Sequence, residues 1–126
     1  MTTLYFLPCL ALAGALGTLA RYGVSLLSTA AFGPAYPYGT LIVNVLGSFL
    51  YGLLAGLPRM SPEMQVIVLT GFLGGFTTFS AYAFENYHLL GQQRYVAFAV
   101  HLAGQNALGI AAVLAGFALS AWVAAR

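Results

Sequence analysis

The sequence predicts an all-α integral membrane protein with four transmembrane helices, and two observations lead to that fold class. Hydrophobic residues make up 61% of the chain and charged residues only 5%, whereas a soluble domain carries about 25% charged residues. The four basic and two acidic side chains leave long apolar stretches between them, each close to the roughly 20 residues that a helix needs to cross a bilayer. We therefore expect a single four-helix transmembrane domain, residues 1–126.

The first two helices are separated by a loop rich in proline and glycine. The first helix is predicted from about residue 4 to about residue 29, and its apolar run is too long for a cleaved signal peptide. The loop at residues 32–37 precedes a second helix over about 38–57. After it, Ser61 and Pro62 are typical of the N-cap and first turn of a new helix.

The third helix, predicted over about 63–90, contains the unusual segment GFLGGFTTFS at 71–80. Glycines and hydroxyl residues lie there at the expected depth of the bilayer centre, where irregular backbone survives only inside protein or beside a polar cavity. Broken helices at that depth form small-ion sites from freed carbonyls and half-helix ends. We therefore predict a broken third helix on an ion pathway. A polar turn at 91–94 then leads to a fourth helix over about 95–123.

Composition excludes several other classes of protein. A net charge of +2 without a basic cluster argues against a nucleic-acid partner. Cys9 is the only cysteine, so an intrachain disulfide and a cysteine-rich metal site are excluded. Common catalytic signatures are also missing from the sequence, so we expect a transport protein rather than an enzyme.

The basic residues leave the orientation in the membrane undetermined. Four spans with short loops place Arg59 and Arg126 on the side of the termini, and Arg94 on the other side with Arg21 leaning toward it. Orientation normally follows the excess of Lys and Arg in cytoplasmic loops. The even balance permits insertion in both directions and an antiparallel homodimer; a weak bias that is still obeyed is the alternative.

Two interpretations remain open for each polar group of the first two spans. Arg21 is costly in a membrane, which makes it a functional candidate, unless it extends to the interface. Asn44 and Ser48 lie on one helix face. Asn44 either links helices by hydrogen bonds or binds an anion through its NH2.

Aromatic and hydroxyl residues recur in the third span. Phe76, Phe79 and Tyr82 follow one another at three-residue intervals. Such a stripe either packs in the core or turns its positive ring edges toward a small anion. Thr78 and Ser80 add hydroxyl donors beside it.

The last polar positions lie toward the ends of the third and fourth spans. Glu85 is predicted near the membrane interface. His101 and Gln105 share one face of the fourth helix, and His101 is interpreted as a packing residue because no second ligand lies at metal-binding spacing.

Three motifs resemble the CrcB/Fluc family of small bacterial fluoride channels. They are GALGTLARY at 14–22, GTLIVNVLGSF at 39–49 and GFLGGFTTFS at 71–80, in the order and spacing of that family. The resemblance implies an antiparallel dual-topology homodimer with two pores, a multi-pass protein of the bacterial cytoplasmic (inner) membrane. It also implies passive, selective fluoride export and a structural sodium ion at the dimer centre, held by the backbone carbonyls of Gly74 and Thr77.

The resemblance also assigns roles to side chains. Asn44, Phe79 and position 82 match the family's pore-lining residues, and Arg21 matches its entry arginine. Neutral donors and ring edges suit a strongly hydrated anion, because they compensate for lost water without binding too tightly. Our candidate fluoride-pore residues are Asn44, Phe79, Tyr82, Thr78, Ser80, Ser48, Arg21, His101 and Gln105.

Two departures from the family pattern stand out. Position 82 is Tyr where the family has Phe, and His101 and Gln105 align with a Tyr and a Ser of the family's fourth helix. We expect both departures to affect rate and pH behaviour more than the choice of ion.

Two rival functions predict different features. A small dual-topology multidrug exporter needs a membrane-embedded acid in its first helix, and this first span has none. A non-transporting membrane subunit needs none of the polar positions inside the spans.

Overall fold

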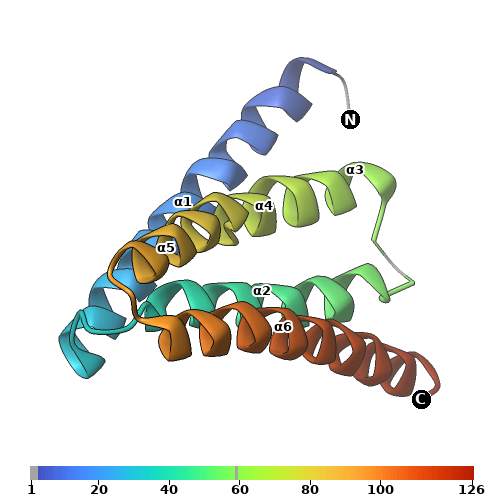
Figure 1. Cartoon of the computed structure of the whole chain (residues 1–126). Helices are drawn as coiled ribbons and strands as arrows, with labels where there is room; N and C mark the ends of the chain where they lie inside the picture. The colour runs from blue at the N-terminus through green and yellow to red at the C-terminus, as the bar shows by residue number, and fades with distance from the viewer. Residues whose placement is uncertain (1–2, 59) are drawn as a thin grey trace.

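The computed structural model describes residues 3–58 and 60–126. Arg59, which entered the charge balance, and residues 1 and 2 lie outside them. The described residues form helices and connecting turns, without a strand. The elements are α1 (Thr3–Phe32), α2 (Tyr38–Ala55), α3 (Pro62–Gln65), η1 (Val66–Leu73), α4 (Gly74–Phe76), α5 (Phe79–Gly91) and α6 (Tyr95–Ala124) (Figure 1).

Four of the resulting segments are long and apolar enough to cross a membrane, which confirms the predicted number of spans and a multi-pass membrane protein. α3, η1, α4 and α5 together make the third of them. The four segments run Tyr5–Phe32, Tyr38–Ala55, Pro62–Gly91 and Tyr95–Ala124.

The turns use the local signals read from the sequence. The Ser61 hydroxyl accepts a hydrogen bond from the Met64 amide at 3.3 Å, and Pro62 occupies the first turn of α3. At the end of α1, Gly33 has φ +77° and its N–H donates to the Thr29 carbonyl at 2.9 Å. That left-handed conformation suits glycine, which has no Cβ, and it ends the helix.

Glycines let α2 and α6 approach backbone to backbone, and the two helices lie side by side (Figure 1). A Cβ on Gly52 would overlap the Val113 carbonyl, and one on Gly116 would overlap the Phe49 carbonyl. Gly56 faces Ser120 in the same contact. The Gly52/Gly56 pair is therefore a packing device.

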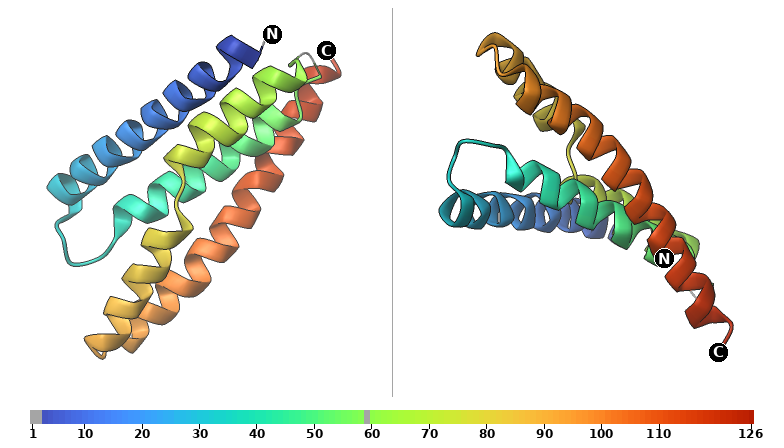
Figure 2. Two further views of the ribbon diagram at one scale, coloured as in Figure 1. Left: turned by 90° about the horizontal axis from the view of Figure 1, so that it is seen from above. Right: turned by 60° about the horizontal axis from the view of Figure 1, so that its bottom comes forward.

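α1 packs against the first half of the third span in the same manner. Gly75 faces the Gly14 backbone, and Gly71 faces Leu10 and Ala13. α5 leaves this group and follows the first half of α6 instead (Figure 2). The first half of the third span thus pairs with α1 and its second half, α5, pairs with α6. The middle of the span lies where the two pairs meet.

The third span bends within the segment singled out from the sequence. Thr77 (φ −84°, ψ 160°) and Thr78 (φ −154°, ψ 119°) are extended between α4 and α5. η1, immediately before, has π-helical hydrogen bonding, a conformation often found at functional sites.

The aromatic stripe predicted in this span is divided by the bend. Phe76 is 5% exposed in a core cluster with Val43, Leu69 and Leu73. Phe79, on α5, is 78% exposed. The prediction of one continuous face failed because it assumed helical spacing through the two extended residues.

Candidate functional site

Asn44 on α2 holds the bend of the third span in place. Its Oδ1 accepts from the Thr78 amide at 2.8 Å, and its Nδ2 donates to the Thr78 carbonyl at 3.1 Å. The same Nδ2 donates to Gln105 Oε1 on α6 at 3.0 Å. One amide therefore satisfies both backbone groups of residue 78 and links three helices, and both of its own N–H groups are engaged.

The two carbonyls predicted to hold sodium have lost their helical donors. In a regular helix, the N–H of residue i+4 would donate to each carbonyl. The Thr78 N–H donates to Asn44 rather than to the Gly74 carbonyl, and the Ala81 N–H donates to Thr78 Oγ1 at 3.1 Å rather than to the Thr77 carbonyl. Carbonyl oxygens without a donor suit a hard cation, so the residues present fit the ion.

Arg21 is half-buried and forms a hydrogen bond to the third span. Its Nε donates to the Gly75 carbonyl at 3.1 Å, next to the bend. Arg21 also lines a cavity of about 270 Å³ together with Thr40, Thr78 and Glu85. The first-span arginine is therefore an internal partner of the third span.

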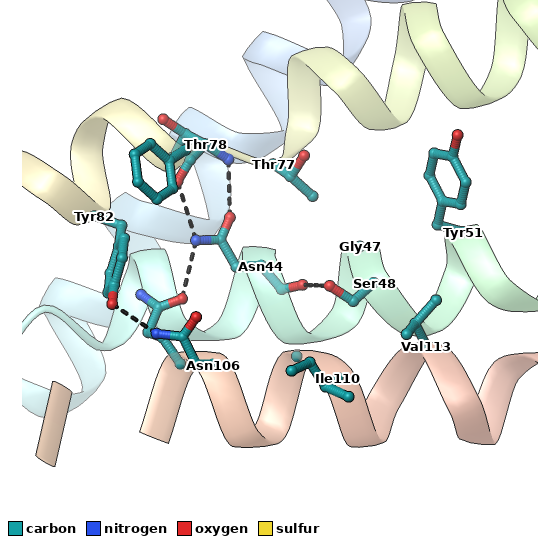
Figure 3. A pocket seen from close by; sticks show the side chains of 13 residues that line it. Asn44, Gly47, Ser48, Tyr51, Thr77, Thr78, Tyr82, Asn106, Ile110 and Val113 are labelled. Atoms are coloured by element: carbon teal, nitrogen blue, oxygen red, sulfur yellow. Dashed lines mark hydrogen bonds between the residues drawn. The ribbon is translucent and has the colours of Figure 1, made fainter. Parts of the chain in front are cut away.

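A cavity of about 460 Å³ gathers most of the candidate pore residues beside the bend (Figure 3). It brings together residues of α2, the bend, α5 and α6. The candidates that line it are Asn44, Ser48, Thr78, Phe79, Tyr82 and Gln105. Ser80 lies next to this group, with its hydroxyl 3.2 Å from Thr78 Oγ1.

Gln105 carries the unpaired donor of this cavity. Its Oε1 accepts from Asn44, while its Nε2 has no hydrogen-bond partner although the residue is only 7% exposed. A buried amide without partners costs free energy that a ligand able to accept hydrogen bonds would recover. Gln105 therefore keeps a buried, unpaired NH2 group among the residues that line the cavity.

The Tyr82 hydroxyl is occupied inside the chain. It donates to the Leu102 carbonyl at 3.3 Å and accepts from Asn106 Nδ2 at 2.9 Å. The ring lies 5.6 Å from that of Phe79, centroid to centroid, at 58°. A phenol has a single proton, and Tyr82 already donates it to Leu102, so this hydroxyl links α5 to α6. Phe79 and Tyr82 therefore border the cavity through their rings.

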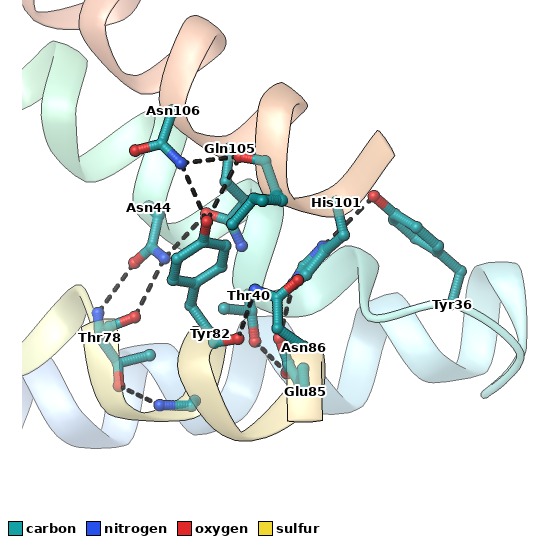
Figure 4. Close-up of polar contacts among 12 residues, drawn as sticks. Tyr36, Thr40, Asn44, Thr78, Tyr82, Glu85, Asn86, His101, Gln105 and Asn106 are labelled. Carbon is teal, nitrogen blue, oxygen red and sulfur yellow. Dashed lines mark hydrogen bonds and ion pairs between the residues drawn. The ribbon is translucent and has the colours of Figure 1, made fainter. Parts of the chain in front are cut away.

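A second polar cluster joins Glu85 to His101 (Figure 4). Thr40 Oγ1 donates to Glu85 Oε1 at 2.5 Å, and His101 Nε2 lies 3.2 Å from Glu85 Oε2. His101 Nδ1 is 3.3 Å from the Tyr36 hydroxyl. Burial, with smaller contributions from Tyr38 and Glu85, raises the pKa of Tyr36, which keeps that hydroxyl protonated and able to donate.

The sequence interpretation missed the Glu85–His101 pair, and a signal for it existed. Glu85 was expected at the interface and His101 without an acidic neighbour. Both residues lie about eight positions from Gln93, which has a φ of 57° in the tight turn between α5 and α6. Antiparallel helices joined by a short turn bring equidistant residues together. Within the described residues, no group of three or more His, Cys, Asp or Glu side chains could hold a metal ion.

Comparison with known proteins adds independent findings. A family model described as CrcB-like protein, Camphor Resistance (CrcB), matches residues 8–117. The fluoride-specific ion channel FluC of Nitrosococcus oceani is 46% identical over 118 residues, which cover 90% of this chain and 94% of the relative. FluC of Solidesulfovibrio magneticus is 50% identical over 114 residues, with 87% and 91% covered. FluC of Nitratidesulfovibrio vulgaris is 44% identical over 111 residues, with 85% and 90% covered.

Proposed function

The chain belongs to the CrcB family, and from that premise we propose that it is a fluoride-specific ion channel. It is a multi-pass protein of the bacterial inner membrane and a transport protein, not an enzyme. Fluoride moves passively, down its gradient, and so leaves a cell that has accumulated it.

The observation that carries this proposal is the buried, unpaired Nε2 of Gln105, a residue that lines the cavity beside the bend. A small anion that leaves water needs hydrogen-bond donors. A cationic ligand would hold it tightly, whereas a neutral amide compensates for dehydration and still releases it. Asn44 can contribute a second amide when an anion replaces Gln105 Oε1 or the Thr78 carbonyl as the acceptor of its N–H.

The exposed ring of Phe79 adds a second type of contact. It is 78% exposed and borders the same cavity. Ring edges carry partial positive charge, so an anion that passes Phe79 edge-on is attracted without a formal charge. Tyr82, tilted against Phe79, extends this aromatic wall.

The channel is proposed to be an antiparallel homodimer with two pores. A large exposed aromatic residue beside a polar cavity is expected where a second subunit completes the wall. The even distribution of basic residues allows the two copies to insert in opposite directions. The lipid bilayer covers the remaining apolar faces.

A structural sodium ion at the dimer centre is proposed to bind the Gly74 and Thr77 carbonyls. Both have lost their helical donors, and a second copy would double the number of oxygen ligands toward the six or more that a hard cation takes. The ion would supply positive charge near the anion pathway.

Fluoride efflux from liposomes tests the proposed function. Purified protein in vesicles loaded with fluoride and chloride should release fluoride, measured with an ion-selective electrode, and retain chloride. Efflux no faster than from empty vesicles, with size-exclusion chromatography showing an intact dimer, would exclude a fluoride channel. Such a result would favour the non-transporting subunit; proton-coupled release of an organic cation would favour the exporter.

A further inference from the structure

The Glu85–His101 pair lies largely inside the protein. His101 is 0% exposed and the Glu85 side chain 25% exposed. Apart from their mutual ion-pair contact, Glu85 Oε2 and His101 Nε2 make no hydrogen bond among the described residues. A protonated Tyr36 hydroxyl that donates to His101 Nδ1 leaves the ring proton of a neutral His101 on Nε2, facing Glu85.

Among the groups packed around them, Glu85 and His101 are the carboxyl and the imidazole that face each other directly. From α1, Arg21 shares a cavity with Glu85, but arginine stays charged. From the loop and from α5, Tyr36 and Tyr82 contact the His101 ring, and burial raises the pKa of Tyr36 further above neutral. From α1, Tyr22 also lines the cavity that Arg21 and Glu85 share. From α2, the neighbour of Glu85 is Thr40, whose hydroxyl does not titrate.

The pair is connected to the cavity that holds Gln105. Glu85 and Thr40 line the 270 Å³ cavity, and Thr78 lines both that cavity and the 460 Å³ cavity at the bend. His101 and Gln105 are four residues apart on α6, about one helical turn, and a unit charge acts strongly over that separation in surroundings of low dielectric constant. The charge of the pair therefore changes the free energy of an anion beside Gln105.

We propose that Glu85 and His101 form a proton-binding site whose occupancy controls how readily an anion enters the cavity at the bend. With no proton the pair carries −1 and opposes the anion. With one proton its net charge is zero, and with two it is +1 and attracts the anion. Fluoride conduction should therefore decrease as the pH rises and the pair loses its proton. The role of the anion rests on the proposed function; the proton site itself does not.

The first test is the pH profile of fluoride efflux between about pH 6 and about pH 9, corrected for empty vesicles, in the range where histidine titrates. The parent protein should conduct at least about threefold more slowly at the alkaline end, since loss of a proton makes the charge of the pair one unit more negative and repels the anion. In the double variant Glu85→Gln/His101→Gln, both side chains stay polar but neither titrates, and this slope should disappear.

His88→Gln is the matched control. The chain has two histidines, and the His88 ring contacts Phe84 and Tyr87 rather than the pair. This variant should keep the parent's pH profile. A double variant with the parent's slope, or a His88→Gln variant that loses it, would overturn the proposal.

A second measurement tests the site without any flux. In the His88→Gln background His101 is the only histidine, so ¹⁵N-histidine NMR in detergent follows its protonation directly. Glu85→Gln removes the adjacent negative charge and should weaken proton binding at His101 by about tenfold or more, one pH unit. Unchanged titration of His101 would refute the pair as a unit. If no variant or parent conducts fluoride at any pH, the proposed function fails while this titration still decides the proton site.

Discussion

In the proposed channel, Gln105 is the residue on which anion binding would most directly depend. Its Nε2 is buried and unpaired, and the residue lines the cavity beside the bend. Gln105→Met keeps length and volume but removes both donors. A hydrogen bond to a charged group contributes about 1.5–3 kcal/mol, so fluoride efflux should fall at least about tenfold. Gln92→Met, in the exposed turn after α5, is the matched control and should conduct at the parent rate.

The Gln105→Met variant also loses the acceptor for Asn44, so its folding needs a separate check. Size-exclusion chromatography and thermal unfolding in detergent should show an intact dimer with a stability loss of about 1 kcal/mol. An intact Gln105→Met dimer that conducts at the parent rate would show that this amide only packs the helices.

Phe79 and Tyr82 differ in what their rings do for the fold. Phe79 is exposed within one chain, so Phe79→Ile should leave the chain folded and slow fluoride strongly if the ring edge contacts the ion. Tyr82→Phe keeps the ring and loses the hydroxyl contacts with Leu102 and Asn106. It should conduct with a changed rate and unfold about 1 kcal/mol more easily. Tyr82→Ile should slow fluoride as Phe79→Ile does.

Efflux and melting temperature together separate these outcomes. Ring loss that lowers flux without lowering stability places the ring on the ion pathway. Parent-rate conduction by folded dimers of both Ile variants would instead assign the aromatic face to packing.

At the scale of elements, the contact of α2 with α6 depends on glycine. A Cβ on Gly116 would overlap the Phe49 carbonyl, whereas Gly104, on the same helix, has nothing within 4 Å of a Cβ. Gly116→Ala should separate the two backbones, lower the melting temperature and disturb the Asn44–Gln105 hydrogen bond. Gly104→Ala should be neutral or stabilising by up to about 1 kcal/mol, because alanine favours helix. Equal melting temperatures for the two variants would contradict this account of the packing.

The existence and number of the helices could be predicted from the sequence, because the length of an apolar stretch and the positions of helix-breaking residues are local properties. Ser61, Pro62 and Gly33 mark ends that the structure shares. The partner of each polar side chain could not be predicted in this way. Whether Arg21 bonds Gly75, or Glu85 meets His101, depends on which helices pack together. Phe76 and Tyr82 are buried, as the core interpretation of the stripe allowed, but Phe79 is exposed; the two extended residues before it change the spacing, which helical periodicity cannot represent.

At the scale of the whole molecule, the Phe79 ring is exposed and the Gly74 and Thr77 carbonyls lack helical donors within the described chain, and we propose that a second molecule supplies the missing contacts. A second copy in the opposite orientation is the proposed source, since the basic residues do not favour one direction. Changing Gln92 and Gln93 to Lys adds two positive charges to the turn beside Arg94. These charges should fix that turn on the cytoplasmic side and prevent the opposite orientation.

Expressed alone, this locked variant should give no fluoride efflux, because every copy inserts the same way and no antiparallel pair forms. Extra Lys near the C-terminus, on the other side of the membrane, should lock the reverse orientation with the same loss. Co-expression of the two should restore efflux, since each supplies the orientation that the other lacks. Thiol labelling of a single cysteine placed in the turn, in a Cys9→Ser background, reports the orientation independently. Full activity of either locked copy alone, with its orientation confirmed by labelling, would refute the antiparallel dimer and require one pore to be completed by parallel copies.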